Sequence, residues 1–211
     1  MDTSARMIGI RIVGNLAVGE PNEDRGLITW LHCIVYESNG NDDDECEADD
    51  ETDIGSALVA IIHVGDAGHY NVSLLDALDA EGAEFEALYP VYFDDDWFKD
   101  EYAQGHGTDL FYIAELSIDD AYRKRNVDLA VVRRLCASFA TGCELVVMPY
   151  ASEEEAQHWS MLGFVVSTEG QASGLMHLQQ ASRGPRVVDF AGNGRFRVLP
   201  NVEPERLRKM N

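Results

Sequence analysis

The sequence predicts a mixed α/β fold (α+β), with a central mixed β-sheet and helices on both faces of the sheet. Segments rich in β-branched and aromatic residues, typical of strands, alternate with segments in which apolar residues recur every three or four positions. Between residues 110 and 148, a strand, a helix and a strand follow one another with short joints, which is a βαβ unit. The 211 residues are enough for one sizeable domain with its own apolar core.

Three strands are predicted in the N-terminal half, at Met7–Val13, Ile28–Tyr36 and Ala57–Val64. Between the second and third strands, residues 39–53 form a polar linker, and nine of the twelve residues from 42 to 53 are acidic. Because like charges repel, we expect this linker to be a loop between two paired strands. A calcium site is the weaker interpretation, because the ordered Asp/Asn–Gly–Glu spacing of an EF-hand loop is missing.

The hydrophobic period changes between Asn71 and Tyr102, where it indicates amphipathic helix broken near Gly82 and Pro90. The end of this stretch interleaves aromatic and acidic residues. They are Tyr92, Phe93, Trp97, Phe98 and Tyr102 among Asp94, Asp95, Asp96, Asp100 and Glu101. Such a cluster can line a pocket for a cationic amine, but it is more often a set of core aromatics beneath a solvated rim.

The βαβ unit consists of a strand at Leu110–Ile118, a helix at Val127–Ala140 and a strand at Leu145–Met148. The two strands are expected to be parallel, with a right-handed crossover. Gly142 stands where a C-terminal cap glycine of the helix belongs.

A second helix is predicted to open at the capping box Ser152–Glu155 and to end before Gly163. After it, Phe164–Ser167 and Gly174–Gln179 are interpreted as a closing hairpin.

The last thirty residues differ in charge from the rest. Residues 182–211 hold seven basic and three acidic side chains, and the segments Val187–Phe190 and Arg195–Leu199 flank a turn at Ala191–Gly194. We therefore divide the chain into one domain, residues 1–181, with its most recognisable core at 108–180. A basic C-terminal extension, residues 182–211, is expected to pack on that domain as a hairpin.

The net charge narrows the classes of partner. Thirty-eight acidic residues against sixteen basic ones give a formal charge of −22, which disfavours nucleic acid and anionic membranes. The charge favours a cationic amine substrate or a basic protein partner, although a solvated surface tuned for solubility is the simpler interpretation.

The spacing of the cysteines and histidines bears on metal binding and on the redox state of the thiols. Cys33, Cys46, Cys136 and Cys143 show no paired metal-ligand spacing, and the histidines form no HExxH pattern, so no metal is predicted. We find neither a cleaved leader nor an apolar run long enough to span a bilayer. Together these features predict a cytoplasmic protein with reduced thiols.

Two motifs resemble the GNAT N-acetyltransferase superfamily. The segment from Tyr112 to Val132, with Tyr122-Arg-Lys-Arg-Asn-Val-Asp at its centre, is similar to the family's central strand–turn–helix motif. The segment His158-Trp-Ser-Met-Leu-Gly-Phe resembles the family's second signature, a helix that ends in Tyr-x-x-Leu-Gly-Phe. The resemblance implies a GNAT-like sheet with an acyl-CoA-binding core. It also implies transfer of an acyl group from acetyl-CoA, or another acyl-CoA, to an amine.

The resemblance also implies roles for particular residues. Leu116 and Ile118, with the strand Leu145–Met148, would hold the pantetheine arm. The residues implied to hold the pyrophosphate are Arg123, Lys124, Arg125, Asn126, Val127 and Asp128. Glu115 is the candidate base, with His106 and Asp109 as a weaker alternative pair.

Physical chemistry supports part of this assignment and opposes part of it. A helix N-terminus presents unpaired N–H groups that bind phosphate, and Asn126 tolerates the left-handed backbone that glycine has there in the family. Asp128, however, is expected to capture those N–H groups itself and to repel a phosphate. Trp159 stands where the family often has a tyrosine, and an indole cannot deliver a proton at neutral pH.

Three functional hypotheses therefore remain open. The first is an acyl-CoA-dependent N-acyltransferase. The second is a GNAT-like protein that has lost catalysis and serves as a binding or regulatory module. The third, supported by charge alone, is an acidic interaction protein.

Overall fold

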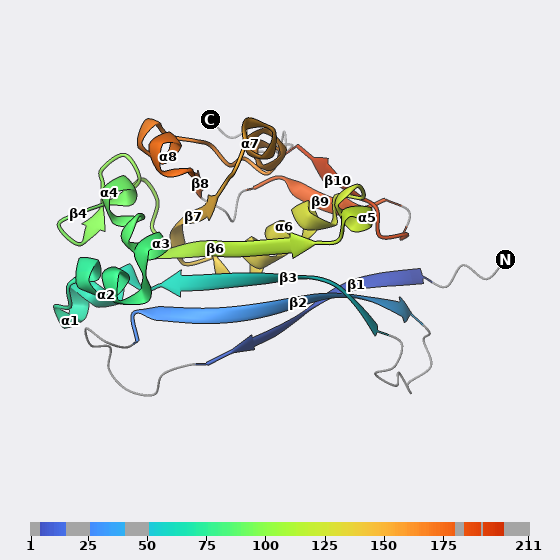
Figure 1. Ribbon diagram of the computed structural model, residues 1–211, viewed down its shortest axis with the longest axis horizontal. Helices are drawn as coiled ribbons and strands as arrows, with labels where there is room; N and C mark the ends of the chain where they lie inside the picture. Colours follow the sequence, from blue (N-terminus) through green and yellow to red (C-terminus); the bar gives the residue numbers. More distant parts are fainter. Residues whose placement is uncertain (1–4, 16–25, 41–50, 180–183, 191, 201–211) are drawn as a thin grey trace, which may run out of the picture.

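The central sheet of the protein has six strands in the order β1-β2-β3-β6-β7-β8 (Figure 1). The computed structural model describes residues 5–15, 26–40, 51–179, 184–190 and 192–200. The strands are β1 (Ala5–Gly14), β2 (Ile28–Gly40), β3 (Glu51–Ile62), β6 (Asp109–Ile118), β7 (Cys143–Pro149) and β8 (Leu175–Gln179). All neighbours are antiparallel except β6 and β7, which are parallel as predicted.

Two apolar cores cover the two faces of the sheet, because side chains along a strand point alternately to either face. Along β6, Phe111 and Ile113 belong to one core, and Leu110 and Tyr112 belong to the other. The first core is completed by α6 (Val127–Phe139) and α7 (Glu153–Ser160). The second is completed by α1 (Val64–Tyr70), α2 (Leu74–Glu81), α3 (Ala83–Glu86) and α4 (Tyr89–Tyr92). The predicted mixed α/β architecture, with helices on both faces, is confirmed.

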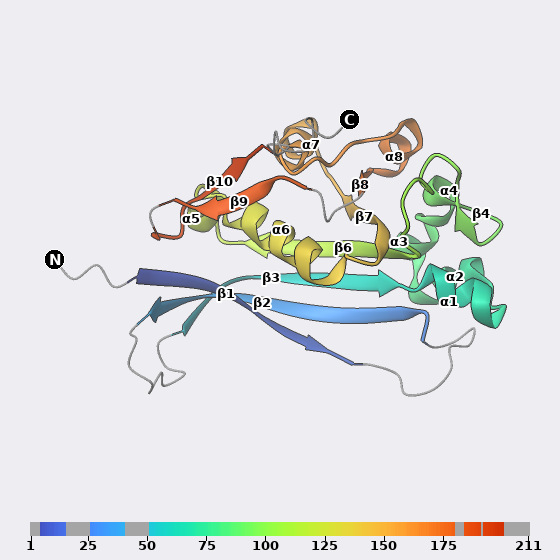
Figure 2. The same cartoon turned by 180° about the vertical axis from the view of Figure 1, so that it is seen from behind.

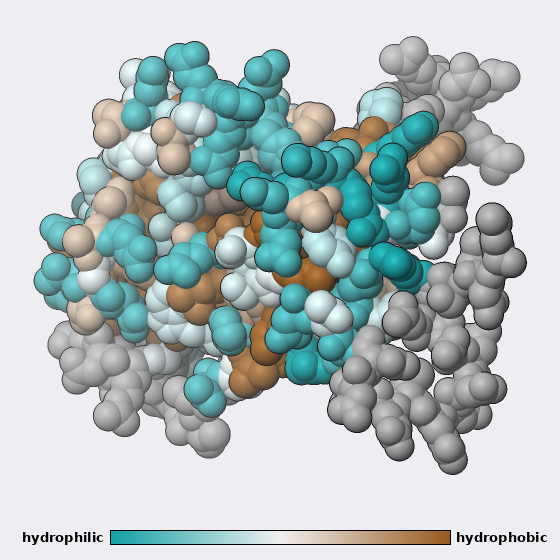
Figure 3. All heavy atoms as spheres, turned by 45° about the vertical axis from the view of Figure 1, so that its right-hand side comes forward, coloured by the Kyte–Doolittle hydropathy of each residue, from teal (hydrophilic) through white to brown (hydrophobic). Residues whose placement is uncertain are grey.

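Helices α1 to α4 gather at one end of the sheet, and the C-terminal hairpin lies at the other (Figures 1 and 2). The hairpin consists of β9 (Arg186–Asp189) and β10 (Phe196–Leu199), paired antiparallel as predicted. It packs against α6, so the basic extension contacts the first core. In the space-filling view, hydrophobic residues lie in the middle of the face shown, among hydrophilic residues (Figure 3).

The N-terminal strands differ from the prediction at their ends. β3 stops at Ile62, two residues early, because Val64 begins α1. A continuous apolar run does not show where a buried strand ends and a helix begins. β2 extends to Gly40 and β3 begins at Glu51, so both strands take residues from the acidic linker. Residues 41–50 of that linker lie outside the described residues.

The helical stretch breaks at Gly82, where a φ of 132° ends α2, as predicted. Beyond α4 the helix prediction is wrong, because β4 (Phe93–Asp94) and β5 (Trp97–Phe98) form a small hairpin. Asp96, in its turn, accepts a hydrogen bond from the Leu74 N–H at 3.1 Å and so holds the start of α2.

The aromatic residues around this hairpin belong to the second core. Tyr92, Phe93, Phe98 and Tyr102 are buried, whereas Trp97 is exposed. These burials support the interpretation as core aromatics rather than as the lining of an amine pocket.

Two smaller predictions in the C-terminal half are wrong. Helix α6 ends at the C-cap Ala140, and Gly142 follows in the next turn without a left-handed backbone. The hairpin expected after Gly163 is reduced to a single bridge between Val165 and His177. Helix α8 (Thr168–Ser173) lies between these residues, because the Ser167 hydroxyl accepts from the Gly170 N–H and begins a helix.

A buried carboxylate joins the loop before β6 to the start of β7. Glu144, at the start of β7, is 4% exposed, and it accepts hydrogen bonds from the N–H groups of Gly105 and Gly107 at 2.5 and 3.0 Å. A Cβ atom at Gly107 would lie 2.2 Å from the main-chain N of Glu144, so the close approach of this loop to β7 requires glycine at that position. The loop that leads into β6 is therefore fixed to β7.

We expect Glu144→Ala to destabilise the protein by about 1–3 kcal/mol for each N–H left unpaired. The measurement is the free energy of unfolding in urea. Glu86→Ala removes an exposed carboxylate from α3 and serves as the control, with a change of less than about 0.5 kcal/mol. Equal stability of the two variants would show that Glu144 does not hold the loop.

Candidate functional site

The parallel strands β6 and β7 separate before either one ends. They pair from Asp109 to Tyr112, whereas β6 continues to Ile118 and β7 to Pro149. β6 also contains a bulge against β3. Ile113 and Glu115 pair with two successive β3 residues, so Ala114 between them has no partner. The main-chain groups on the facing sides of the two strands therefore do not pair with each other beyond Tyr112.

A cavity of about 310 Å³ occupies this opening. β6 contributes Ile113, Ala114, Leu116 and Ile118; β7 and the loop after it contribute Met148, Pro149, Tyr150 and Ala151; and Arg123, Asp128, Glu155 and Trp159 complete the lining. The walls formed by the strands are largely apolar. The charged residues come from the short helix α5 (Asp120–Arg123), the first turn of α6, and α7.

Asp128 occupies the N-terminal turn of α6 and is only 2% exposed. Its Oδ1 accepts a hydrogen bond from the Leu129 N–H at 2.9 Å, and its Oδ2 lies 2.7 Å from Nε2 of His158 and 3.8 Å from Nε of Arg123. The carboxylate also lies at the positive end of the helix dipole. The predicted capture of a helix N–H by Asp128 is therefore confirmed.

Trp159 is buried and lines the cavity with its indole ring. The indole N–H lies 3.5 Å from Oε1 of Glu155, and Oε2 of Glu155 accepts from the Ala151 N–H at 2.9 Å. Ser152 Oγ accepts from the Glu155 N–H, which is one half of the predicted capping box; in the other half the Glu155 carboxylate binds the N–H of Ala151 instead of that of Ser152. Glu155 thus holds both the start of α7 and the tryptophan of the cavity wall.

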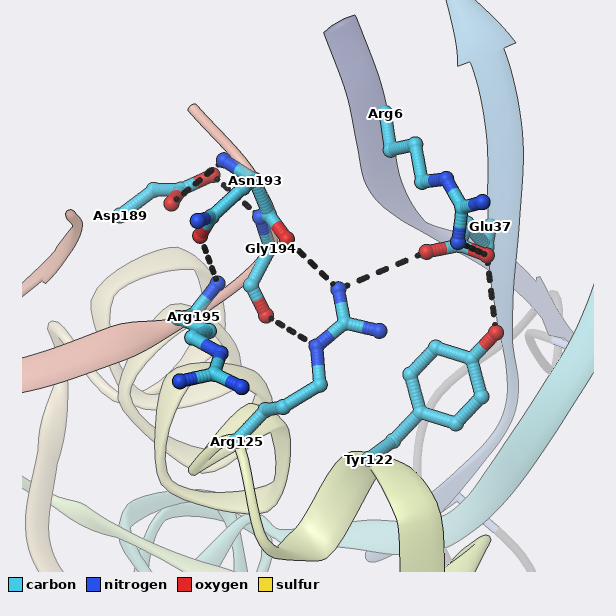
Figure 4. Close-up of polar contacts among 8 residues, drawn as sticks. All are labelled: Arg6, Glu37, Tyr122, Arg125, Asp189, Asn193, Gly194 and Arg195. Carbon is cyan, nitrogen blue, oxygen red and sulfur yellow. Dashed lines mark hydrogen bonds and ion pairs between the residues drawn. The ribbon is translucent and has the colours of Figure 1, made fainter. Parts of the chain in front are cut away.

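Arg125 does not line the cavity; it binds the C-terminal hairpin instead (Figure 4). Its Nε donates to the Gly194 carbonyl at 3.0 Å, and its Nη2 donates to the Asn193 carbonyl at 2.8 Å. The same guanidinium lies 3.5 Å from Glu37, which is also the acceptor for the Tyr122 hydroxyl at 2.8 Å. Burial and this hydrogen bond raise the pKa of Tyr122, which keeps its hydroxyl protonated as a donor.

Asn126 binds the hairpin as well. It adopts the left-handed backbone expected of it, with a φ of 60°, and its side-chain amide donates to the Phe196 carbonyl at 2.9 Å. The Phe196 N–H donates to the Arg125 carbonyl at the same distance. Gly194 also requires glycine, because its φ is 66° and a Cβ atom there would collide with Arg125.

The predicted site residues therefore divide into groups. Leu116, Ile118, Arg123 and Asp128 line the cavity. Arg125 and Asn126 bind the hairpin, Val127 is fully buried in the first core, and Lys124 is exposed. Glu115 is exposed and does not line the cavity; since Leu116 packs toward the first core, strand alternation points Glu115 to the other face of the sheet.

The sequence analysis missed several cavity residues, of which Tyr150 and Glu155 carry polar groups. Tyr150 directly follows a strand of a βαβ unit, a position that often carries functional side chains, so this signal was available. The involvement of Ala114 depends on the bulge, for which the sequence has no signal.

The alternative pair His106 and Asp109 does not form. Asp109 lies instead 3.5 Å from Nδ1 of His63, whose Nε2 lies 3.0 Å from the Thr29 hydroxyl. The hydrogen bond and charge of Asp109 raise the pKa of His63, against the opposing effect of burial. This group joins the ends of β2, β3 and β6, away from the cavity.

The cysteines offer no reactive thiol in the described part of the chain. Cys33, Cys136 and Cys143 are free and buried, and burial raises the pKa of both Cys136 and Cys143 to about 12. Cys46 lies outside the described residues. Among the described residues, no three His, Cys, Asp or Glu side chains are placed to hold a metal ion. No described helix has the length and apolar character needed to cross a membrane.

Comparisons with known proteins give no match for this chain, whether with protein-family models, with curated proteins or with solved structures.

We expect Arg125→Ala to loosen the hairpin, because three contacts of one guanidinium are lost. Hydrogen bonds to charged groups each contribute about 1.5–3 kcal/mol, so amide exchange in residues 186–199 should accelerate tenfold or more. The measurement is hydrogen–deuterium exchange with mass spectrometry.

Arg195→Ala removes an exposed arginine from the same hairpin and is the matched control. Unchanged exchange in the Arg125 variant would mean that packing on α6 and the hydrogen bonds of Phe196 to Asn126 and to the Arg125 main chain are enough to hold the hairpin.

Proposed function

We propose that this protein is an acyl-CoA-dependent N-acyltransferase of the GNAT type, which transfers an acetyl or related acyl group to an amine. The observation that carries the proposal is the separation of β6 from β7, with a cavity between the two strands. The sequence motifs that resemble the GNAT superfamily fall on the same elements, since β6, α6 and α7 contain them.

The cavity suits an acyl-pantetheine arm. Such an arm is narrow and carries amide groups, and facing strand edges offer it unpaired N–H and C=O groups beyond Tyr112. The apolar walls formed by Ile113, Leu116 and Met148 suit its methylene groups and a short acyl chain. The N-terminal turn of α6 does not suit the pyrophosphate in the same way, because Asp128 occupies it.

The roles of individual residues follow from their positions in the proposal. Acetyl-CoA supplies an acyl group activated as a thioester. Glu115, the base implied by the sequence motif, is exposed on the other face of the sheet and does not line the cavity, so the geometry gives it no direct route to an amine bound there. Tyr150 brings a hydroxyl to the cavity wall and can donate a proton to a leaving thiolate, which Trp159 cannot do.

A second candidate function is favoured by the contacts of Asp128. Its carboxylate already binds His158 and lies near Arg123, and Arg125 is bound to the hairpin. A protein built in this way could bind a partner or ligand without catalysing transfer. The strongly acidic composition fits a basic partner, but no contact in the structure adds to that argument.

The experiment that tests the first proposal is a titration of acetyl-CoA and free CoA, followed by thermal unfolding at low and high salt. A ligand at a hundredfold its dissociation constant adds about 2.7 kcal/mol of stability. We expect a clear rise in melting temperature. Asp128→Asn should strengthen binding about tenfold or more, because a carboxylate near a phosphate costs a few kcal/mol. Arg123→Ala should weaken it.

Asp100→Asn removes one exposed charge outside the cavity lining and is the control for the net charge. No rise in melting temperature at millimolar ligand, in the wild type and in Asp128→Asn, contradicts the acyltransferase proposal. If acetyl-CoA binds, an assay with added amines distinguishes the two functions: a transferase forms the amide and releases CoA with a free thiol, and a binding protein does not.

A further inference from the structure

A second, larger cavity of about 680 Å³ lies between β1, α6 and the C-terminal hairpin. Three arginines line it, Arg133 and Arg134 on α6 and Arg186 on β9, so we call it the arginine groove. It shares no lining residue with the cavity between β6 and β7. An inference about it therefore stands independently of the acyltransferase proposal.

The charge of the groove is opposite to that of the chain. The chain has 38 acidic and 16 basic residues, yet none of the described acidic residues lines the groove. Arg134 and Arg186 are exposed, and within the described residues neither forms an ion pair. An arginine guanidinium forms two parallel hydrogen bonds with a carboxylate, so these side chains suit an acidic ligand.

The floor of the groove is apolar. Ile8, Ile10 and Ile12 lie on one face of β1, because side chains alternate along a strand. Ile12 is 38% exposed, and Ile8 and Ile10 are only partly buried. β1 is also the edge strand of the six-stranded sheet. A ligand that covers this floor must therefore offer apolar groups as well as carboxylates.

The dimensions favour a short extended peptide. The stretch of β1 from Ile8 to Ile12 spans about 13 Å at roughly 3.3 Å per residue, so about four or five extended residues match it. Arg134 on α6 and Arg186 on β9 give the groove two cationic groups, enough to pair with two carboxylates along one chain. The overall negative charge does not forbid such a ligand, because exposed charges beyond about 8 Å are largely screened at physiological ionic strength.

We propose that the arginine groove binds an extended acidic segment of a partner protein. Alternate apolar side chains of that segment lie on Ile8, Ile10 and Ile12, and its carboxylates pair with Arg134 and Arg186. This specifies a binding surface and the chemistry of its partner.

The test uses the full chain and a fluorescein-labelled peptide of about eight residues that alternates glutamate and valine, with binding followed by fluorescence anisotropy. We expect saturable binding, and at least a tenfold weaker affinity for both Arg134→Glu and Arg186→Glu. Arg195→Glu changes the net charge equally on the same hairpin but lies outside the groove lining, so its affinity should stay within twofold. A peptide that alternates lysine and valine should not bind.

Hydrogen exchange locates the bound peptide. Binding should slow amide exchange in residues 8–12 and 130–139, and it should leave residues 113–118 unchanged.

The proposal is wrong if the acidic peptide does not bind at millimolar concentration, or if Arg134→Glu and Arg195→Glu bind it equally well. It is also wrong if oleate, but not the peptide, raises the melting temperature in an Arg134-dependent way, which would indicate a lipid site. Self-association that Arg134→Glu abolishes would instead indicate a second copy of this chain.

Discussion

Four residue pairs hold β6 to β7, and the strands then separate toward Ile118 and Pro149. The candidate site depends on this separation, because the cavity lies between the two strands and the start of α6 completes its lining. Glu144 fixes the opposite end of the pair by binding the loop before β6. The strands are thus joined at one end and apart at the other, and the bulge at Ala114 lies where they separate.

The turn between β6 and α6 shows how the same residues can serve structure instead of ligand binding. Asp128 satisfies a helix N–H with its own carboxylate, and Arg125 uses its guanidinium to hold the C-terminal hairpin. Arg123, with its side chain half exposed at the cavity, lies 3.8 Å from the Asp128 carboxylate. If the protein binds CoA, its phosphates must therefore compete with Asp128, and the pantetheine arm must provide most of the affinity.

Much of this arrangement could be predicted from the sequence because it follows from local rules. The left-handed backbone of Asn126 and the capping of α7 by Ser152 are of this kind. Long-range contacts could not be predicted. Neither the pairing of Asp109 with His63 nor the attachment of Arg125 to Gly194 leaves a sequence pattern, since each joins residues far apart in the chain. The same holds for the two sides of the arginine groove, which only the tertiary fold brings together.

The most direct test of the central claim is methyl NMR of the protein labelled at isoleucine, leucine and methionine, with acetyl-CoA added. If the opening between β6 and β7 is the acyl-CoA site, the methyl signals of Ile113, Leu116 and Met148 should shift most. Those of Ile8 and Ile10, on the floor of the arginine groove, should stay in place. Saturable shifts confined to the groove, or no shifts at millimolar acetyl-CoA, would contradict the account.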